Sequence, residues 1–549
     1  MKPKKPHPLV PELANEMKKG RLDRREFLRL STLLGLSAGA AYTLAGLGLP
    51  RRALAAAPKR GGTILVSAKL QKITHPAQYS WIMPSNVTRQ VAEYLTYYGA
   101  DNVSRPYLLE SWETSDDLKT WTLNLRRNVT WNNGDKFTAD DVVFTFNQWL
   151  NKDVKSSILG LMGKYLDSSG IEKVNDYQIK LNLRVPEIAV PEHLYHYPAQ
   201  ILNAKTFEGD FLKNPVGTGP FTLESYQEGK LCVLKARKDY WQKGADGKPM
   251  PYVDEVKVLD VGADMAPHIA ALKSGEVHLI DNSDQPGPQL TNAVKDDPNV
   301  KVLPVTTATT RVLRMRADIK PFDDNRVRMA LKLCQNREKI LALAYQNEGI
   351  QGQDIHVFPQ HPEYCEVPTP GYQPDKAKAL LKEAGYKDGI KLEMAVGSEW
   401  PDIVRYSEVL KQDCKAGGID LILKPMPTSQ YWEKWTEVAL GITPWTHRPL
   451  GTMFANLAYT VDKEGKPVPW NETRWVDDEY NKLLQEANGT VDVEARRKIF
   501  CQMEKIQQER GSIGIAYWMN NWLCPRKELM GVEAHPNIYF DLGKAWLDV

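Results

Sequence analysis

The sequence lacks the short motifs that mark common catalytic sites. After the N-terminal segment 1–55, the 549-residue chain contains no G-x-S-x-G nucleophile elbow, no H-E-x-x-H zinc motif and no Walker-type phosphate loop. The G-x-S-x-G match GLSAG at 35–39 lies in the apolar N-terminal run, without the strand-to-helix context of a nucleophile elbow. The GTGPF stretch at 217–221 has neither the lysine nor the strand-to-helix context of a phosphate cradle. We therefore expect no enzyme activity, no catalytic residue and no cofactor.

Cysteine and histidine are too sparse to predict a metal site. No C-x-x-C pair occurs, and the ten histidines are scattered without a Cys/His cluster. His193 and His196 could share a helix face, and His356 and His361 are close in sequence, but such pairs are usually not ligands. Uptake of a metal chelate or of heme stays open, because such a ligand needs few protein donors.

The six cysteines leave the disulfide pattern open. In an oxidising compartment they could pair in fifteen ways, and sequence alone cannot choose among them. Several occupy apolar helical positions, where buried thiols are common. The sequence therefore predicts no particular bridge among Cys232, Cys334, Cys365, Cys414, Cys501 and Cys524.

The excess of basic over acidic side chains is confined to the N-terminal segment. Residues 1–55 hold eleven of the 71 Lys and Arg residues and only four of the 68 Asp and Glu residues. The remainder has 60 basic and 64 acidic side chains, so it carries no basic footprint of the kind that binds nucleic acid.

This segment is typical of an export leader. A charged stretch precedes the apolar run LRLSTLLGLSAGAAYTLAGLGL, and RRALAAAP follows with small residues at Ala53 and Ala55. The stretch DRREFLRLS resembles a twin-arginine (Tat) signal, with Arg24 and Arg25 as the pair and Asp23 where Ser or Thr is usual. We expect cleavage after Ala55, which gives a 1–55 leader read by the Tat export machinery.

The alternative is an uncleaved membrane helix, because about twenty apolar residues are just enough to span a bilayer. Four glycines in the run disfavour that helix, and an A-x-A site follows it. No cysteine lies near the cleavage site, so a lipid anchor is not expected. The sequence predicts a soluble, periplasmic mature protein.

Along the mature chain, hydrophobic residues repeat with the period of a strand in some segments and with the period of a helix in others. TWTLNL (120–125) alternates strictly, which predicts a half-buried strand. TADDVVFTFNQWL (138–150) predicts a helix with Thr138 as N-cap and Asp141 completing a capping box. PDKAKALLKEAGY (374–386) predicts another helix with proline at its first position. The intermixed strands and helices predict an α/β protein.

Several long stretches together resemble one family, the large periplasmic solute-binding proteins of peptide, nickel and opine ABC importers (family 5). Residues 108–146 resemble its signature segment almost position by position, and the similarity runs from about Gly61 to the C-terminus. His278 departs from the usual Asp. The other stretches that resemble the family, in the right order, are VGTGPF (216–221), DYW (239–241), IAALKSGEV (269–277), PFDDNRVRMALKLCQNREKI (321–340) and YQPDKAKALLKEAGY (372–386).

The resemblance implies an α/β, bilobal periplasmic binding protein-like (type II) fold with an additional third domain. It implies a monomer whose two lobes close over a peptide or peptide-like, opine-like solute, and whose closed form is presented to ABC permease subunits in the inner membrane. The expected division is 1–55 leader, 56–104 lobe I (first part), 105–214 extra domain, 215–312 lobe I (second part), 313–508 lobe II and 509–549 lobe I (C-terminal part).

Residues 444–449, PWTHRP, match the family loop in which peptide binders carry Trp, a small residue and then Asp for the ligand's α-ammonium group. Trp445 and Thr446 fit this pattern, but His447 or Arg448 stands where the acid is expected. A cation disfavours a peptide N-terminus and favours an anionic or sugar-like ligand. Alternatively, Arg448 pairs with an acid inside the protein, or an acid from another segment replaces the missing one.

Four aromatic residues are further candidates for ligand contact. Tyr79 and Trp81 follow the first predicted strand, where family members often contact ligand. Trp400 lies in a strand-to-helix connection, a common cleft position in α/β sheets, and Trp518 lies near the C-terminal crossover. A packing role is the alternative for each of the four.

Overall fold

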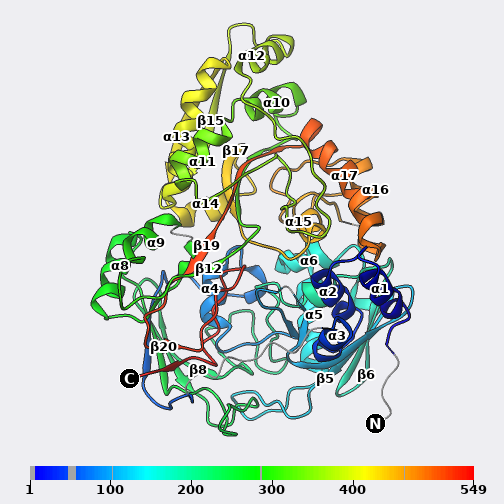
Figure 1. Ribbon diagram of the computed structural model, residues 1–549, viewed down its shortest axis with the longest axis vertical. Helices are drawn as coiled ribbons and strands as arrows, with labels where there is room; N and C mark the ends of the chain where they lie inside the picture. Colours follow the sequence, from blue (N-terminus) through cyan, green and yellow to red (C-terminus); the bar gives the residue numbers. More distant parts are fainter. Residues whose placement is uncertain (1–5, 47–56, 102, 285–286, 463) are drawn as a thin grey trace. The chain divides into compact units, whose positions relative to one another are not determined.

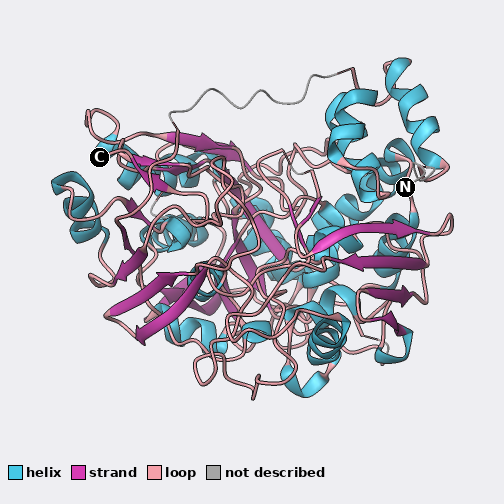
Figure 2. Ribbon diagram, turned by 90° about the horizontal axis from the view of Figure 1, so that it is seen from below, coloured by secondary structure: helices cyan, strands magenta, loops and turns pink. Residues whose placement is uncertain are grey.

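The computed structural model describes residues 6–46, 57–101, 103–284, 287–462 and 464–549, and it forms two compact units (Figure 1). Unit 1 contains residues 1–283, 294–303 and 523–549, and unit 2 contains residues 284–293 and 304–522. Figure 2 shows helices and strands intermixed throughout the chain, which confirms the predicted α/β class.

Unit 1 holds two separate larger sheets. Its strands are β1 Thr63–Ser67, β2 Thr96–Tyr97, β3 Arg105–Pro106, β4 Leu109–Thr114, β5 Thr120–Leu125, β6 Ile171–Asn175, β7 Gln178–Asn182, β8 Phe221–Gln227, β9 Leu231–Ala236, β10 Glu255–Leu259, β11 Leu279–Ile280, β20 Leu529–Met530 and β21 Trp546–Leu547. The five-stranded sheet has the order β11-β1-β10-β9-β8, and the four-stranded sheet has the order β4-β5-β7-β6.

The helices of unit 1 are short. They are α1 Leu9–Lys18, α2 Arg24–Leu33, α3 Ala38–Leu44, η1 Pro76–Gln78, α4 Ile82–Thr88, α5 Ala139–Leu150, η2 Lys152–Val154, α6 Ser157–Met162, η3 Ser168–Gly170, α7 Val190–His193 and α8 Met265–Ser274. Among the helices of the described residues, none has the length and apolarity needed to cross a membrane.

The four-stranded sheet lies within the segment expected to form the extra domain, and its local structure follows the sequence pattern. In β5 every second residue is buried (Trp121, Leu123 and Leu125), and the residues between them are half-buried. At the start of α5 the Thr138 backbone N–H donates to the Asp141 carboxylate at 2.9 Å, within the predicted capping box. Both elements depend only on neighbouring residues, so the sequence predicts them correctly.

The predicted leader forms the helices α1, α2 and α3, which pack on unit 1. Asp23, where a Tat signal usually has Ser or Thr, caps α2 by accepting a hydrogen bond from the Glu26 N–H at 2.8 Å. The twin residues Arg24 and Arg25 are exposed. The cleavage-site residues Ala53 and Ala55 lie outside the described residues.

Unit 2 is built on one six-stranded sheet with the order β14-β18-β13-β17-β15-β16. Its elements are β13 Thr310–Met315, α10 Asn325–Leu333, α11 Arg337–Tyr345, β14 Gly349–Gln351, α12 Pro374–Glu383, β15 Ile390–Gly397, α13 Pro401–Ala416, β16 Ile419–Met426, α14 Thr428–Lys434, β17 Leu440–Trp445, α15 Gly451–Ala458, α16 Asp478–Gly489, α17 Val493–Arg510 and β18 Ile513–Met519. Proline occupies the first position of α12, as predicted.

The boundary between the two units falls close to four short elements, η4 Asn282–Asp284, α9 Pro288–Val294, β12 Leu303–Val305 and β19 Asn521–Leu523. Strand β18 pairs with β13 in the sheet of unit 2, so this unit continues to Trp522. The expected division placed the end of lobe II at residue 508, before β18. The six-segment division stays a prediction.

Candidate functional site

Two of the predicted site tryptophans lie at the same level of the unit 2 sheet. Strand β13 runs antiparallel to both β17 and β18, and Thr310 is the register partner of Trp445 on one side and of Trp518 on the other. Both indoles are buried. Residues 73 positions apart in sequence are thereby brought together at one end of the sheet.

A buried carboxylate orients Trp445. The Glu472 Oε1 atom accepts a hydrogen bond from Trp445 Nε1 at 2.8 Å, and Oε2 accepts one from Thr443 Oγ1 at 2.6 Å. The Arg314 guanidinium forms an ion pair with the same carboxylate at 3.2 Å. Burial raises the pKa of Glu472, and Arg314 opposes that rise. This acid is therefore already engaged by protein donors.

The cation of the loop braces the loop itself. Arg448 Nη1 donates to Thr446 Oγ1 at 2.7 Å, to the His447 carbonyl oxygen at 2.8 Å and to the Thr446 carbonyl oxygen at 3.2 Å. His447 Nδ1 accepts a hydrogen bond from the Ala308 N–H at 3.0 Å. All three loop side chains are at least 96% buried. The loop is a shaped, positively charged element rather than a polar surface turn.

The connection between β14 and α12 (residues 352–373), which we call the support loop, contacts the 444–449 loop. His361 Nδ1 accepts from the Phe358 N–H at 2.9 Å, so its Nε2 carries the proton and donates to the Arg448 carbonyl oxygen at 2.8 Å. Glu363 Oε2 accepts from the Gly451 N–H at 3.2 Å, at the start of α15. The support loop thus holds the 444–449 loop and the helix that follows it.

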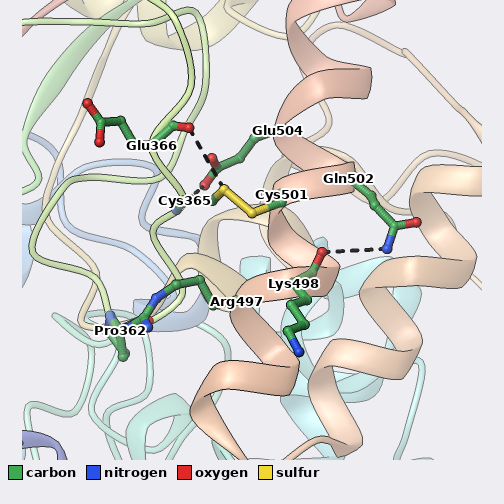
Figure 3. Close-up of a disulfide and its surroundings, with 8 residues drawn as sticks. All are labelled: Pro362, Cys365, Glu366, Arg497, Lys498, Cys501, Gln502 and Glu504. Carbon is green, nitrogen blue, oxygen red and sulfur yellow. Dashed lines mark hydrogen bonds between the residues drawn. A yellow bond between two sulfur atoms is a disulfide. The ribbon is translucent and has the colours of Figure 1, made fainter. Parts of the chain in front are cut away.

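A disulfide fastens the support loop to α17 (Figure 3), and an ion pair adds a second link. Cys365 and Cys501 are bonded across 136 residues of sequence, with their Cα atoms 5.2 Å apart. Arg497 Nη2 donates to the Pro362 carbonyl oxygen at 3.1 Å, and the nearby Arg496 and Glu363 form a buried pair at 3.2 Å. The sequence left this bridge among fifteen possibilities.

Two buried polar atoms beside the loop have no hydrogen-bond partner among the described residues. They are Nε2 of His356 and Nε1 of Trp518, on rings whose centroids are 6.2 Å apart. His356 stacks on Phe454 at 4.1 Å, and its Nδ1 lies 3.0 Å from the Tyr459 hydroxyl. Burial lowers the pKa of His356 well below its usual range, so the ring is neutral. Leaving such groups unpaired is costly, so each has hydrogen-bonding capacity that a polar ligand atom or water can use.

His356 is a candidate that the sequence did not single out for ligand contact. It was considered only with His361 as a metal pair, although both precede the support loop's cysteine in one polar stretch. Its position beside Trp445, at 5.0 Å between ring centroids, depends on folding of the support loop over β17. No local pattern in the sequence carries that information.

The remaining aromatic candidates each make contacts within their own unit. Trp400 is buried and packs edge-on against Tyr431 and Trp432, each at 5.5 Å between ring centroids, as its packing alternative required. Tyr79 and Trp81 are buried in unit 1, where Trp81 Nε1 donates to the Ser283 carbonyl oxygen at 3.1 Å. Their roles toward a ligand stay predictions.

The histidine pair considered for a metal is engaged in the protein. His193 Nδ1 lies 2.8 Å from the Tyr165 hydroxyl, and His196 Nε2 lies 3.4 Å from Ser157 Oγ. Within the described ranges, no group of three or more His, Cys, Asp or Glu side chains is arranged to hold a metal ion.

Comparison with known proteins identifies relatives along most of the chain. The family described as "Bacterial extracellular solute-binding proteins, family 5 Middle" matches residues 104–463. Di/tripeptide-binding protein 1 of Pseudomonas aeruginosa is 29% identical over 74% of this chain and 79% of its own. The dipeptide-binding protein of Escherichia coli is 26% identical over 78% of this chain and 84% of its own.

Solved structures with the same fold share less sequence. The binding protein AgaA of A. tumefaciens in complex with agropinic acid superposes with a TM-score of 0.80 at 22% identity, covering 89% of this chain and 99% of its own. DppA of Helicobacter pylori in complex with the peptide STSA has a TM-score of 0.79 at 20% identity, with the same coverage.

Proposed function

Because this chain belongs to the bacterial extracellular solute-binding proteins of family 5, we propose that it captures a short peptide or a peptide-like, opine-like solute for an ABC importer. The chain has the predicted type II fold and is the substrate-binding component of such a transporter. Members of this family bind solutes and deliver them to a permease, and they are not enzymes.

The names of the relatives support a peptide-like cargo. Two curated relatives are di- or tripeptide-binding proteins, and two solved neighbours hold agropinic acid and a four-residue peptide. The unpartnered Nε2 of His356 and Nε1 of Trp518 supply hydrogen-bonding capacity for such a polar solute. Trp445 and Phe454 add the apolar walls that ligand sites usually have.

The 444–449 loop favours a solute that presents an anionic group. Where peptide binders of this family carry an acid for the ligand's ammonium group, this chain has His447 and Arg448. The nearby acid Glu472 is engaged by Arg314, Thr443 and Trp445, so it is a poor substitute. Charge of this sign disfavours a free amino terminus and favours a carboxylate. This loop chemistry is the observation that carries the preference for blocked peptides and opine-like compounds.

A matched peptide panel tests this preference. A dipeptide, its N-acetylated form and its C-amidated form are compared by thermal shift and titration calorimetry, together with agropinic acid. A ligand at a hundredfold excess over its Kd raises the unfolding free energy by about 2.7 kcal/mol. We expect the N-acetylated dipeptide to bind at least as tightly as the free one and the C-amidated form to bind more weakly. Loss of binding on N-acetylation alone would contradict the preference.

An anionic or oligosaccharide-type solute, or a metal chelate or heme, is the alternative cargo. The neutral imidazole of His356 favours a chelate, since its Nε2 is buried and has no hydrogen bond among the described residues. Titration with nickel–histidine and with heme, followed by absorbance and by melting temperature, separates this alternative from the peptide-like one. A shift with nickel–histidine that is lost in His356→Phe would support it.

Export by the Tat route places this function in the periplasm. We expect the mature protein to be a monomer that begins at Ala56, after removal of residues 1–55. Intact mass spectrometry of protein from the periplasmic fraction tests the cleavage point, and Arg24→Lys/Arg25→Lys tests the route by abolishing export. Export that persists in this variant would contradict the Tat assignment.

A further inference from the structure

A cavity of about 420 Å³ lies in unit 1, and its lining includes three cationic side chains and one carboxylate. The cations are Arg126, Lys243 and Lys544, and the carboxylate is Asp541. Its size is within the usual range for sites that bind small ligands. All four residues belong to unit 1, whereas the 444–449 loop belongs to unit 2.

Aromatic rings lie against two of these cations, and the carboxylates of Glu110 and Glu93 act on Arg126 from a longer distance. The Arg126 guanidinium lies over the Trp241 ring at 4.9 Å from its centroid, and Lys544 Nζ lies 5.7 Å from the centroid of Tyr97. A ring quadrupole attracts a cation without neutralising it. The positive charge of both side chains therefore remains available to an anion in the cavity.

A hydrogen bond to the backbone fixes the position of the Arg126 side chain. Its Nε donates to the Tyr107 carbonyl oxygen at 2.6 Å, and this leaves the two Nη groups for another acceptor. Trp241, on which Arg126 rests, donates from Nε1 to the buried Glu93 carboxylate at 3.0 Å. Glu93 in turn accepts a hydrogen bond from the Tyr240 hydroxyl at 2.6 Å. A site with donors held in this way loses little entropy when a ligand binds.

The cavity has more positive than negative charge, and its one acid does not offset the three cations. Among the residues that the structure describes, Arg126, Lys243 and Lys544 form no ion pair. Asp541 accepts a hydrogen bond from the Gly543 N–H at 2.9 Å within its own turn. We propose that this cavity binds a small, multivalent oxyanion, such as a polycarboxylate or phosphate. The oxyanion would bridge the guanidinium of Arg126 and the two ammonium groups.

Titration calorimetry of the full chain with citrate and with inorganic phosphate, at constant ionic strength, tests the proposal. We expect at least one of the two anions to bind. The variant Lys243→Gln/Lys544→Gln changes two exposed side chains and should weaken binding at least tenfold, and Arg126→Gln should do the same. The matched control Lys238→Gln, at an exposed lysine outside the cavity, should leave the affinity unchanged.

A further variant separates this site from the solute-binding loop. Arg448→Gln should leave citrate or phosphate binding at the unit 1 cavity intact while it weakens the peptide-like solute. Absence of binding for both anions in the wild-type protein would overturn the proposal. So would an affinity that survives in Lys243→Gln/Lys544→Gln with an unchanged melting temperature, or one that depends on Arg448 alone.

Discussion

Trp445 donates a hydrogen bond of 2.8 Å from its indole Nε1 to Oε1 of Glu472. This single contact joins the strand that leads into the 444–449 loop to a buried carboxylate, and Arg314 balances that carboxylate from β13 at 3.2 Å. Glu472, hydrogen-bonded to the end of β17, thus orients an aromatic side chain, and its carboxylate is not available to pair with a ligand's ammonium group. The positive charge of the loop is that of Arg448.

Removing Glu472 should destabilise unit 2. Glu472→Gln leaves the buried Arg314 without its carboxylate, and breaking one side of a buried pair typically costs about 3–5 kcal/mol. Urea unfolding followed by tryptophan fluorescence measures the loss. Asp318→Asn is the matched control, because it breaks the more exposed Arg316–Asp318 pair, which is worth under about 1 kcal/mol. Equal effects of the two variants would contradict the assigned role of Glu472.

Removing the cation of the loop should weaken solute binding. Arg448→Gln deletes a charge-assisted donor, which is worth about 1.5 kcal/mol or more, roughly a tenfold rise in Kd. Titration calorimetry with the tightest binder of the peptide panel measures the change, and the exposed Lys466→Gln is the control. An unchanged Kd for Arg448→Gln would contradict the proposed ligand contact and leave this arginine with a structural role within its own loop.

The disulfide should be present in exported protein and should stabilise the site. Denatured, unreduced protein is expected to alkylate at the four other cysteines only, with the peptides of Cys365 and Cys501 linked in mass spectrometry. Cys365→Ser/Cys501→Ser should lower the unfolding free energy by about 2–5 kcal/mol. It should also raise the Kd of the solute, because the support loop carries His361 and Glu363. Reductant should produce the same changes in wild type and none in the variant.

Glu504 should make stability fall as pH rises. Burial raises its pKa to about 9 in the folded chain from an ordinary value of 4.5. Between these two pH values the folded state binds the proton and the unfolded state does not. The unfolding free energy should therefore fall by up to about 1.4 kcal/mol per pH unit in that window. Glu504→Gln should flatten the profile and be more stable than wild type at pH 8. The exposed Glu509→Gln should leave the profile unchanged.

Local elements of this fold follow from the sequence, and the site does so only in part. The alternation in 120–125 and the capping pair Thr138–Asp141 depend on side chains within a few residues, so period and propensity suffice to predict them. The family resemblance predicts Trp445 to Arg448 at the site, and strand pairing puts Trp518 and Trp445 on opposite sides of Thr310 in β13.

The contacts that complete the site are long-range. The Cys365–Cys501 bond spans 136 residues, and His356 reaches Trp445 and Trp518 only through the path of the support loop. Sequence spacing holds no signal for either contact, because nothing near Cys365 specifies which of five other cysteines it meets. The ligand contact predicted for Trp400 from its strand-to-helix position stays a prediction, and in the structure this side chain packs against Tyr431 and Trp432.

The most direct test of the account is a crystal structure of the exported protein with the solute that co-purifies with it, after native mass spectrometry has identified that solute. The account predicts a peptide-like or opine-like molecule whose carboxylate contacts the Trp445–Arg448 loop and whose polar atoms meet His356 Nε2 and Trp518 Nε1. A solute that places a free ammonium group against this loop, or that makes no contact with it, would contradict the account.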